Sequence, residues 1–144
     1  QQKVKEDIMF KKLAHVCLNV SNLDSSLNFY KSLGLKVNFI FTRNGKNFGA
    51  YLEISSGSFI EIFENPEQTK KENCGLAHFC LEADDIDLVI TKLAELKISH
   101  TEKKLGCDGT YQIWLKDPDG YPFEIHQYTK DSSQFTMKNV EADW

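Results

Sequence analysis

The sequence lacks the short motifs that mark several large enzyme classes. It contains no GxGxxG segment and no GxxxxGKS or GxxxxGKT segment, so nothing supports a phosphate-binding loop for a nucleotide. It contains no GxSxG segment either, which leaves a serine hydrolase without support. None of the four cysteines belongs to a CxxC pair, so a zinc ribbon or a thioredoxin-like redox centre is not supported.

Long apolar runs and blocks of basic residues are also absent. No stretch is apolar over the length that a bilayer span requires, which argues against a membrane protein. The formal net charge is -4 and no Lys/Arg block is present, so nucleic acid is not an expected partner. Residues 1–12 are polar and lack the apolar centre of a secretion signal. We therefore expect a cytoplasmic protein with reduced thiols.

The composition is that of an ordinary globular domain. The chain has 144 residues, of which 41% are hydrophobic and 26% are charged. This length suffices for one domain, or for two small modules that share a core, without help from disulfides. We therefore treat residues 1–144 as a single domain.

A repeat with an offset of 63 residues organises the sequence. The segment Leu13–Leu18 (LAHVCL) returns as Leu76–Leu81 (LAHFCL), with five of the six residues identical. The same offset relates Tyr51-Leu52 to Trp114-Leu115, and Ile60-Glu61-Ile62 to Phe123-Glu124-Ile125. The chain is predicted to hold two copies of one unit, 11–65 and 74–128. A polar linker is expected at 70–73, with arms or frayed ends at 1–10 and 129–144.

Each copy is predicted to fold in the order βαβββ, which makes the domain α+β. In the first copy we expect strands at 14–20, 35–42, 48–54 and 58–63, and a helix capped by Asn22 or Asp24 and stopped by Gly34. In the second copy we expect strands at 77–83, near Ser99, at 110–115 and at 121–128, and a helix capped by Asp84 or Asp85. A tight turn is predicted at 117–120. Two such sheets side by side, with their helices outside, would leave a concave inner face.

Strand alternation predicts which side chains line that concave face. In each first strand the apolar residues must face the helix, so His15 and His78 face the open side. In each last strand, apolar residues flank Glu61 and Glu124, which therefore face the same side. A single histidine on a strand is weak evidence for a metal site. Four metal-compatible residues at equivalent positions of the repeat are far less likely to occur by chance. They predict a site for one divalent ion such as Zn, Ni, Co, Mn or Fe.

Several further residues share this face and leave alternatives open. His126 could support Glu124 or contact a substrate, although a histidine on the rim is the simpler interpretation. Cys17 and Cys80 are soft metal ligands in principle, but small side chains that line a pocket are the simpler interpretation. Tyr51 and Trp114 occupy equivalent positions, where they could form a pocket wall or belong to the core.

This pattern resembles the vicinal oxygen chelate superfamily over about residues 11–128. The matching segments are Leu13–Leu18, Ser32–Leu35, Phe59–Ile62, Leu76–Phe79 and Asp117–Glu124. Within the superfamily, the complete His/Glu/His/Glu set is similar to glyoxalase I. Extradiol dioxygenases and fosfomycin-modifying members typically use two His and one Glu, and bleomycin-sequestering members generally lack the set. Glu61 is therefore the residue that discriminates among these classes.

The resemblance implies a lyase or isomerase that converts the hemithioacetal of methylglyoxal and a thiol through an enediolate. Glu61 or Glu124 would be the catalytic base, and a homodimer would be expected. Asn19 stands where the family usually has an Arg that grips glutathione, whereas Asn65 matches the family's Asn. With His126 and Trp114, these residues form the expected substrate-binding set. The alternatives are an epimerase or related metalloenzyme, and a protein that binds small metabolites or antibiotics.

Overall fold

The computed structural model of the protein describes residues 12–69 and 76–143. The predicted linker at 70–73 and the predicted arm at 1–10 lie outside the described residues. In chain order, the elements are β1 (His15–Val20), α1 (Leu23–Ser32), β2 (Lys36–Arg43), β3 (Lys46–Ser55), β4 (Ser58–Glu64), the 3-10 helix η1 (Pro66–Gln68), β5 (Phe79–Glu82), α2 (Ile86–Glu95), β6 (Lys104–Leu105), β7 (Tyr111–Lys116), β8 (Pro122–Gln127) and α3 (Ser133–Thr136).

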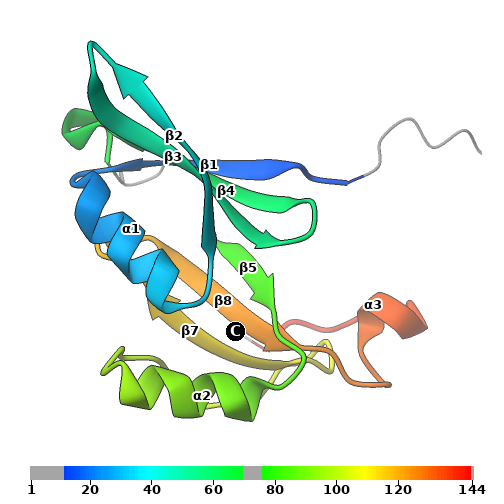
Figure 1. The fold of residues 1–144 in the computed structure, drawn as a ribbon. Coiled ribbons are helices and arrows are strands. Elements are labelled where there is room, and N and C mark those ends of the chain that lie inside the picture. The colour runs from blue at the N-terminus through cyan, green and yellow to red at the C-terminus, as the bar shows by residue number, and fades with distance from the viewer. Residues whose placement is uncertain (1–11, 70–75, 144) are drawn as a thin grey trace, which may run out of the picture.

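The strands form two four-stranded sheets of the same design (Figure 1). The first has the order β1-β4-β3-β2 and the second has the order β5-β8-β7-β6. In each sheet the first strand of the repeat runs parallel to the last, and the remaining pairs are antiparallel. The predicted α+β class and the paired βαβββ units are confirmed. We call β1–β4 with α1 the first module, and β5–β8 with α2 the second module.

The structure decides which residue caps each helix, where the sequence left two candidates for each. The Asn22 side chain accepts a hydrogen bond from the Ser25 amide at 2.9 Å, so Asn22 rather than Asp24 caps α1. The Asp85 side chain accepts from the amides of Asp87 and Leu88, so it caps α2. Neither helix, and no other within residues 12–69 and 76–143, is long and apolar enough to cross a membrane.

The prediction of a strand near Ser99 is wrong. No strand includes Ser99, and the edge strand beside β7, on the side away from β8, is the two-residue β6. The Thr101 amide donates to the Trp114 carbonyl at 2.9 Å, and the Thr101 hydroxyl accepts from the Trp114 amide at 2.9 Å. Because a side-chain hydroxyl takes the place of a backbone carbonyl here, the ladder does not continue and the segment stays irregular.

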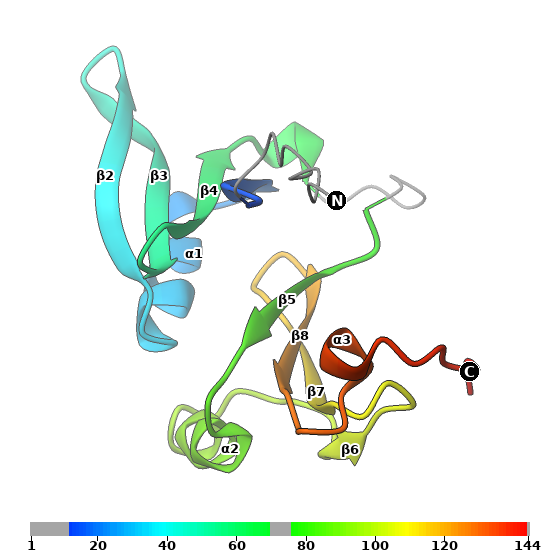
Figure 2. The ribbon, with the colours of Figure 1, turned by 90° about the vertical axis from the view of Figure 1, so that its right-hand side faces the viewer.

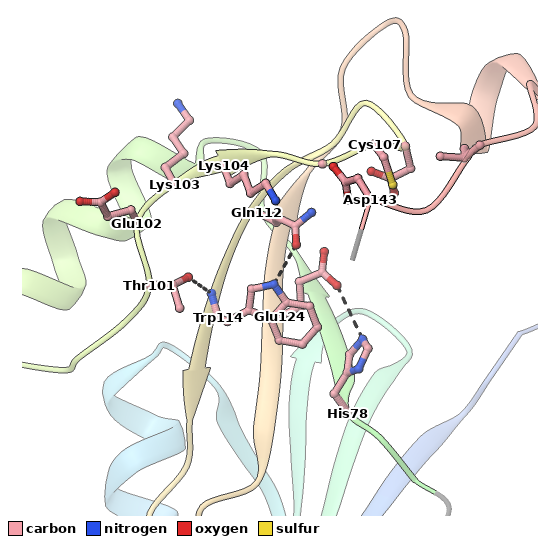
Figure 3. Close-up of a pocket in the computed structure, with 13 residues that line it drawn as sticks. His78, Thr101, Glu102, Lys103, Lys104, Cys107, Gln112, Trp114, Glu124 and Asp143 are labelled. Carbon is pink, nitrogen blue, oxygen red and sulfur yellow. Dashed lines mark hydrogen bonds and ion pairs between the residues drawn. The ribbon is translucent and has the colours of Figure 1, made fainter.

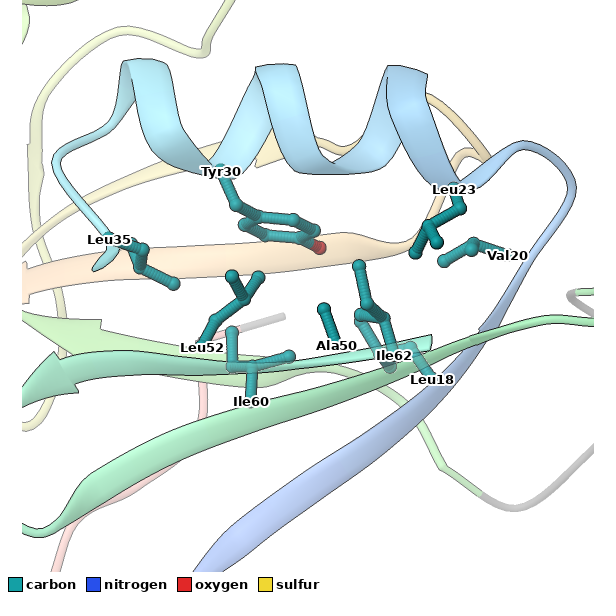
Figure 4. Close-up of a cluster of buried hydrophobic side chains, with 9 residues drawn as sticks. All are labelled: Leu18, Val20, Leu23, Tyr30, Leu35, Ala50, Leu52, Ile60 and Ile62. Atoms are coloured by element: carbon teal, nitrogen blue, oxygen red, sulfur yellow. The ribbon is translucent and has the colours of Figure 1, made fainter. Parts of the chain in front are cut away.

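Each module buries the apolar side of its sheet under its helix. In the first module this core consists of Leu18, Val20, Leu23, Tyr30, Leu35, Ala50, Leu52, Ile60 and Ile62 (Figure 4). In the second module it consists of Ile86, Leu93, Ile113, Leu115, Phe123 and Ile125. Burying one such Leu, Ile or Phe side chain contributes about 1.5–3 kcal/mol. The alternating partners of these residues are therefore directed to the opposite, open face of each sheet.

Helix α1 also joins the two modules, because it lies against the second sheet as well as its own (Figures 1 and 2). The Phe29 ring meets the Phe123 ring edge-on at 6.3 Å, and the Tyr30 hydroxyl donates to Asp117 Oδ2 at 2.8 Å. The expectation that both helices lie outside the sheets is therefore wrong, because α1 lies between the two sheets. The helix-facing sides of both sheets share this contact, so their open faces lie on the outside of the chain.

We predict that Tyr30→Phe lowers the free energy of unfolding by about 1–3 kcal/mol, since it removes the donor to a buried carboxylate. Tyr30 is 0% exposed and Asp117 is 5% exposed. Burial and the charge of Asp117 raise the pKa of Tyr30, which keeps its hydroxyl protonated as a donor. Denaturant unfolding measures the change. Tyr111→Phe is the control, because that hydroxyl makes no hydrogen bond within the described part of the chain; equal stability of the two variants would contradict the prediction.

Candidate metal centre

The first module places His15 and Glu61 side by side on its open face. Strands β1 and β4 are parallel neighbours, and their register sets Cys17 opposite Glu61. His15 Nε2 lies 3.7 Å from Glu61 Oε1. The other ring nitrogen, Nδ1, is hydrogen-bonded to the Tyr51 hydroxyl at 3.0 Å. Tyr51 therefore fixes the imidazole so that Nε2 stays directed toward the carboxylate, as partners of metal-binding histidines commonly do.

The second module repeats this arrangement with a different supporting residue. His78 Nε2 lies 3.7 Å from Glu124 Oε2 (Figure 3). The Trp114 ring meets the His78 ring edge-on at 4.5 Å, in the place that Tyr51 takes in the first module. The Trp114 indole donates to Gln112 Oε1 at 2.7 Å, which fixes the indole in turn. Both modules thus hold an imidazole against a carboxylate. Within the described residues, a hydrogen bond orients the imidazole in the first module, from Tyr51, but not in the second.

The donor groups suit a divalent ion. The Glu61 and Glu124 side chains are only 18% and 14% exposed. Among the described residues, neither carboxylate has a Lys or Arg partner: each is paired with histidine, and a cysteine thiol lies beside it. A half-buried carboxylate without a cation is costly, and a bound metal ion relieves that cost. The four residues therefore fit the predicted metal chemically.

The four predicted ligands do not form one cluster within the chain. Among residues 12–69 and 76–143, the only group of three or more potential ligands within 4.8 Å of one another is Cys80, Glu124 and His126. The His15 and His78 side chains remain 38% and 37% exposed. The chain thus presents two half-sites, each on the open face of its own sheet.

The two thiols beside these pairs are held in the protonated form. Burial, together with a hydrogen bond to Glu61 and its charge, raises the pKa of Cys17 to about 11. Cys80 is exposed as a whole, but partial desolvation of its thiol and the charge of Glu124 raise the pKa of Cys80 to about 12. Neither thiol is therefore a nucleophile at neutral pH in the absence of a metal ion.

The predicted substrate-binding residues separate into two groups. His126 and Trp114 lie at the second half-site, and the His126 side chain is 13% exposed, with Nδ1 3.6 Å from Glu124 Oε1. His126 is therefore inside the site rather than on an open rim. Asn19 and Asn65 lie at the first module, where their backbones are held: the Asn19 carbonyl accepts from the Tyr121 hydroxyl, and the Asn65 amide donates to the Val20 carbonyl.

A cavity of about 1000 Å³ opens beside the second half-site. Its wall includes His78, Gln112, Trp114 and Glu124 from the sheet, and Val140 and Asp143 from the C-terminal segment (Figure 3). That segment is anchored where Ser132 Oγ donates to the Gly109 carbonyl and Gln134 Nε2 donates to Asp108. Residues 129–134 thus fold against the second module, and the exposed segment that follows reaches the cavity through Val140 and Asp143. The repeat could not reveal this, because the segment lies outside it.

The open face of the first module is aromatic. Phe39 stacks on Tyr51 at 5.0 Å and Phe63 stacks on Phe48 at 5.4 Å, and further ring contacts link these pairs. Gly49 makes this packing possible, because a Cβ there would lie 2.4 Å from the Phe63 ring. The two half-sites therefore differ in their surroundings: aromatic rings flank Glu61, whereas Glu124 lies between Trp114 and the polar His126 side chain.

Two βαβββ modules with a His and a Glu on each open face define a paired-module domain of a known class. A family model described as the Glyoxalase/Bleomycin resistance protein/Dioxygenase superfamily matches residues 12–125, and the chain belongs to this superfamily.

Two curated relatives and one solved structure show the diversity of this family. The metallothiol transferase FosB of Shouchella clausii is 25% identical over 127 residues, which cover 84% of this chain and 83% of that protein. A probable lactoylglutathione lyase of Vibrio parahaemolyticus is 26% identical over 131 residues, which cover 85% and 94%. The crystal structure of a glyoxalase family protein from Enterococcus faecalis superposes with a TM-score of 0.71 at 31% identity, covering 81% of this chain and 98% of that one.

Proposed function

We propose that this protein is a metal-dependent lyase or isomerase of the glyoxalase I type, which acts on the hemithioacetal of a 2-oxoaldehyde such as methylglyoxal. The observation that carries the proposal is the pair of His–Glu contacts at 3.7 Å, one on each sheet. With Glu61 present, the donor set is two imidazoles and two carboxylates, the set that the resemblance associates with this reaction. The similarity to a probable lactoylglutathione lyase supports the same activity.

We propose further that two copies of the chain assemble each site. Helix α1 joins the modules on their helix-facing sides, which leaves each His–Glu pair on an outer face. A first module from one copy against a second module from the other would bring the two pairs together and cover both faces. A twofold dimer formed this way holds two equivalent sites. It would also cover strand edges that are costly to leave unpaired.

In this assembly each residue has a defined task. His15, Glu61, His78 and Glu124 would hold the divalent ion, which would supply positive charge to stabilise negative charge on the substrate oxygens. Tyr51 and Trp114 keep the imidazoles oriented. Glu124 takes the proton from the carbon next to the carbonyl and returns it to the neighbouring carbon, so the substrate passes through an enediolate. The cavity beside Glu124 receives the body of the substrate.

We predict that unchelated protein carries about one divalent ion per chain, because a dimer with two shared sites has one site for each chain. Elemental analysis of protein purified without chelator measures the content. Treatment with a chelator should remove both the metal and the lyase activity, and one of the five candidate ions should restore them. Protein that turns over substrate at full rate after its metal has been removed would contradict the proposal.

A second candidate is an isomerase or epimerase that applies the same proton transfer to another small substrate. The aromatic open face of the first module favours it, because stacked rings suit a flat or apolar group better than the charged ends of glutathione. Asn19 also favours it, because the family usually has at this position an Arg that grips glutathione. Assays that compare hemithioacetals of glutathione with those of apolar thiols, and with CoA thioesters, separate the two candidates.

A further inference from the structure

Three potential ligands gather at one point of the second module. Strands β5 and β8 are parallel, and their register sets Cys80 directly opposite Glu124. His126 follows two residues later on the same face of β8. The Cys80 sulfur, a Glu124 oxygen and a His126 nitrogen all lie within 4.8 Å of one another. Small side-chain rotations bring such atoms to the roughly 2.0–2.3 Å from a common point that a metal ion requires.

The two oxygens of Glu124 face different histidines. Oε2 lies 3.7 Å from His78 Nε2, and Oε1 lies 3.6 Å from His126 Nδ1. The side with His78 belongs to the shared site proposed above. The side with His126 and Cys80 is complete within one chain and needs neither the first module nor a second copy.

The repeat supplies an internal contrast. Cys17 lies opposite Glu61 just as Cys80 lies opposite Glu124, but the equivalent of His126 is Phe63, since 126 − 63 = 63. The Phe63 ring stacks on Phe48 and packs over Gly49, so it belongs to the aromatic face. The first module therefore has the thiol and the carboxylate but no imidazole at the position of His126, and among the described residues it forms no such group of three.

We propose that Cys80, Glu124 and His126 form a second metal site, which has Glu124 in common with the shared site and binds a thiophilic divalent ion such as Zn²⁺. Binding forms a bond from the Cys80 sulfur to the ion and releases the thiol proton to solvent. A thiolate, an imidazole and a carboxylate favour Zn²⁺ over Mg²⁺ or Ca²⁺, which prefer oxygen ligands alone. Three protein ligands leave a fourth position for water, so the ion is exchangeable.

Cobalt(II) tests this proposal, because it occupies zinc sites and absorbs in the near ultraviolet when a thiolate binds it. Titration of the reduced, metal-free full chain with Co²⁺ should produce this sulfur-to-cobalt band. Cys80→Ser should abolish the band, and this exposed residue can be replaced by a nearly isosteric one without disturbing a core. His126→Phe, which copies the first module, should weaken the Co²⁺ affinity of the band by at least about tenfold.

Two controls separate this site from the proposed function. Cys17→Ser should leave the band unchanged, because Cys17 has no imidazole partner of this kind. His15→Ala damages the shared site but not this one, so it should also keep the band even if the lyase activity is lost. Absence of the band in the wild-type chain, its persistence in Cys80→Ser, its loss in Cys17→Ser or His15→Ala, or full affinity in His126→Phe would each overturn the proposal.

Discussion

Replacing Glu124 by Gln should reduce the turnover of the authentic substrate by about two to four orders of magnitude, the range that a general base contributes. The amide keeps the shape of the side chain and one ligand oxygen, but it cannot accept the proton. Metal should remain largely bound, because His15, Glu61 and His78 are unchanged. Steady-state kinetics with metal analysis of the same samples measure both effects. Because Glu124 is also a ligand of the proposed Cys80 site, the samples should be loaded with no more than one equivalent of metal per chain.

Glu61→Gln is the matched comparison, since the repeat relates the two glutamates. We expect the larger loss at Glu124, which follows the Asp117–Gly120 turn. In that turn the Asp117 carboxylate accepts from the amides of Asp119 and Tyr121, which holds the start of β8 rigidly. The cavity also opens on the Glu124 side. If Glu61→Gln is inactive and Glu124→Gln is fully active, Glu61 rather than Glu124 is the base. If both variants keep full activity, a ligand glutamate does not transfer the proton.

The repeat is the reason that much of the fold and the candidate site could be predicted. Because the offset of 63 residues has no gaps, a strand predicted in one copy strengthened the prediction of the equivalent strand in the other. The alternation of side chains along a strand then assigned His15, Glu61, His78 and Glu124 to the open faces. The structure has His15 against Glu61 and His78 against Glu124, as strand neighbours should lie. These are local consequences of pairing a parallel β1 with β4, or β5 with β8.

Features that depend on contacts between distant segments could not be predicted in this way. Asn22 and Asp24 are both good capping residues, and only the backbone geometry at the start of α1 decides between them. Strand β6 lies at Lys104–Leu105 because Thr101 bonds the backbone of Trp114, a contact that no periodicity reports. The packing of α1 against the second module depends on contacts between residues far apart in the sequence. Examples are the Phe29 ring against the Phe123 ring, and the hydrogen bond between Tyr30 and Asp117, which lie 87 residues apart.

That packing leads to the second large expected effect, which is the recovery of activity on mixing two inactive variants. His15→Ala damages the first module and His78→Ala damages the second, so each variant alone should lose its shared metal and its activity. In a mixed dimer, one site combines the two damaged modules and the other combines the two intact modules. Half of the dimers are mixed when equal amounts exchange subunits at random, so about a quarter of the wild-type sites should be restored.

The measurement is lyase activity and metal content after the two variants are unfolded together, refolded and reloaded with metal. Each variant treated alone provides the background, and wild-type protein taken through the same cycle defines full recovery. A mixture of Glu124→Gln with His78→Ala is the negative control, because both changes lie in the second module and every site in a mixed dimer receives one of them. If each chain instead closed its own site from both modules, no intact site could form in either mixture. Recovery near a quarter in the first mixture and none in the second therefore requires a site built from the first module of one copy and the second module of the other.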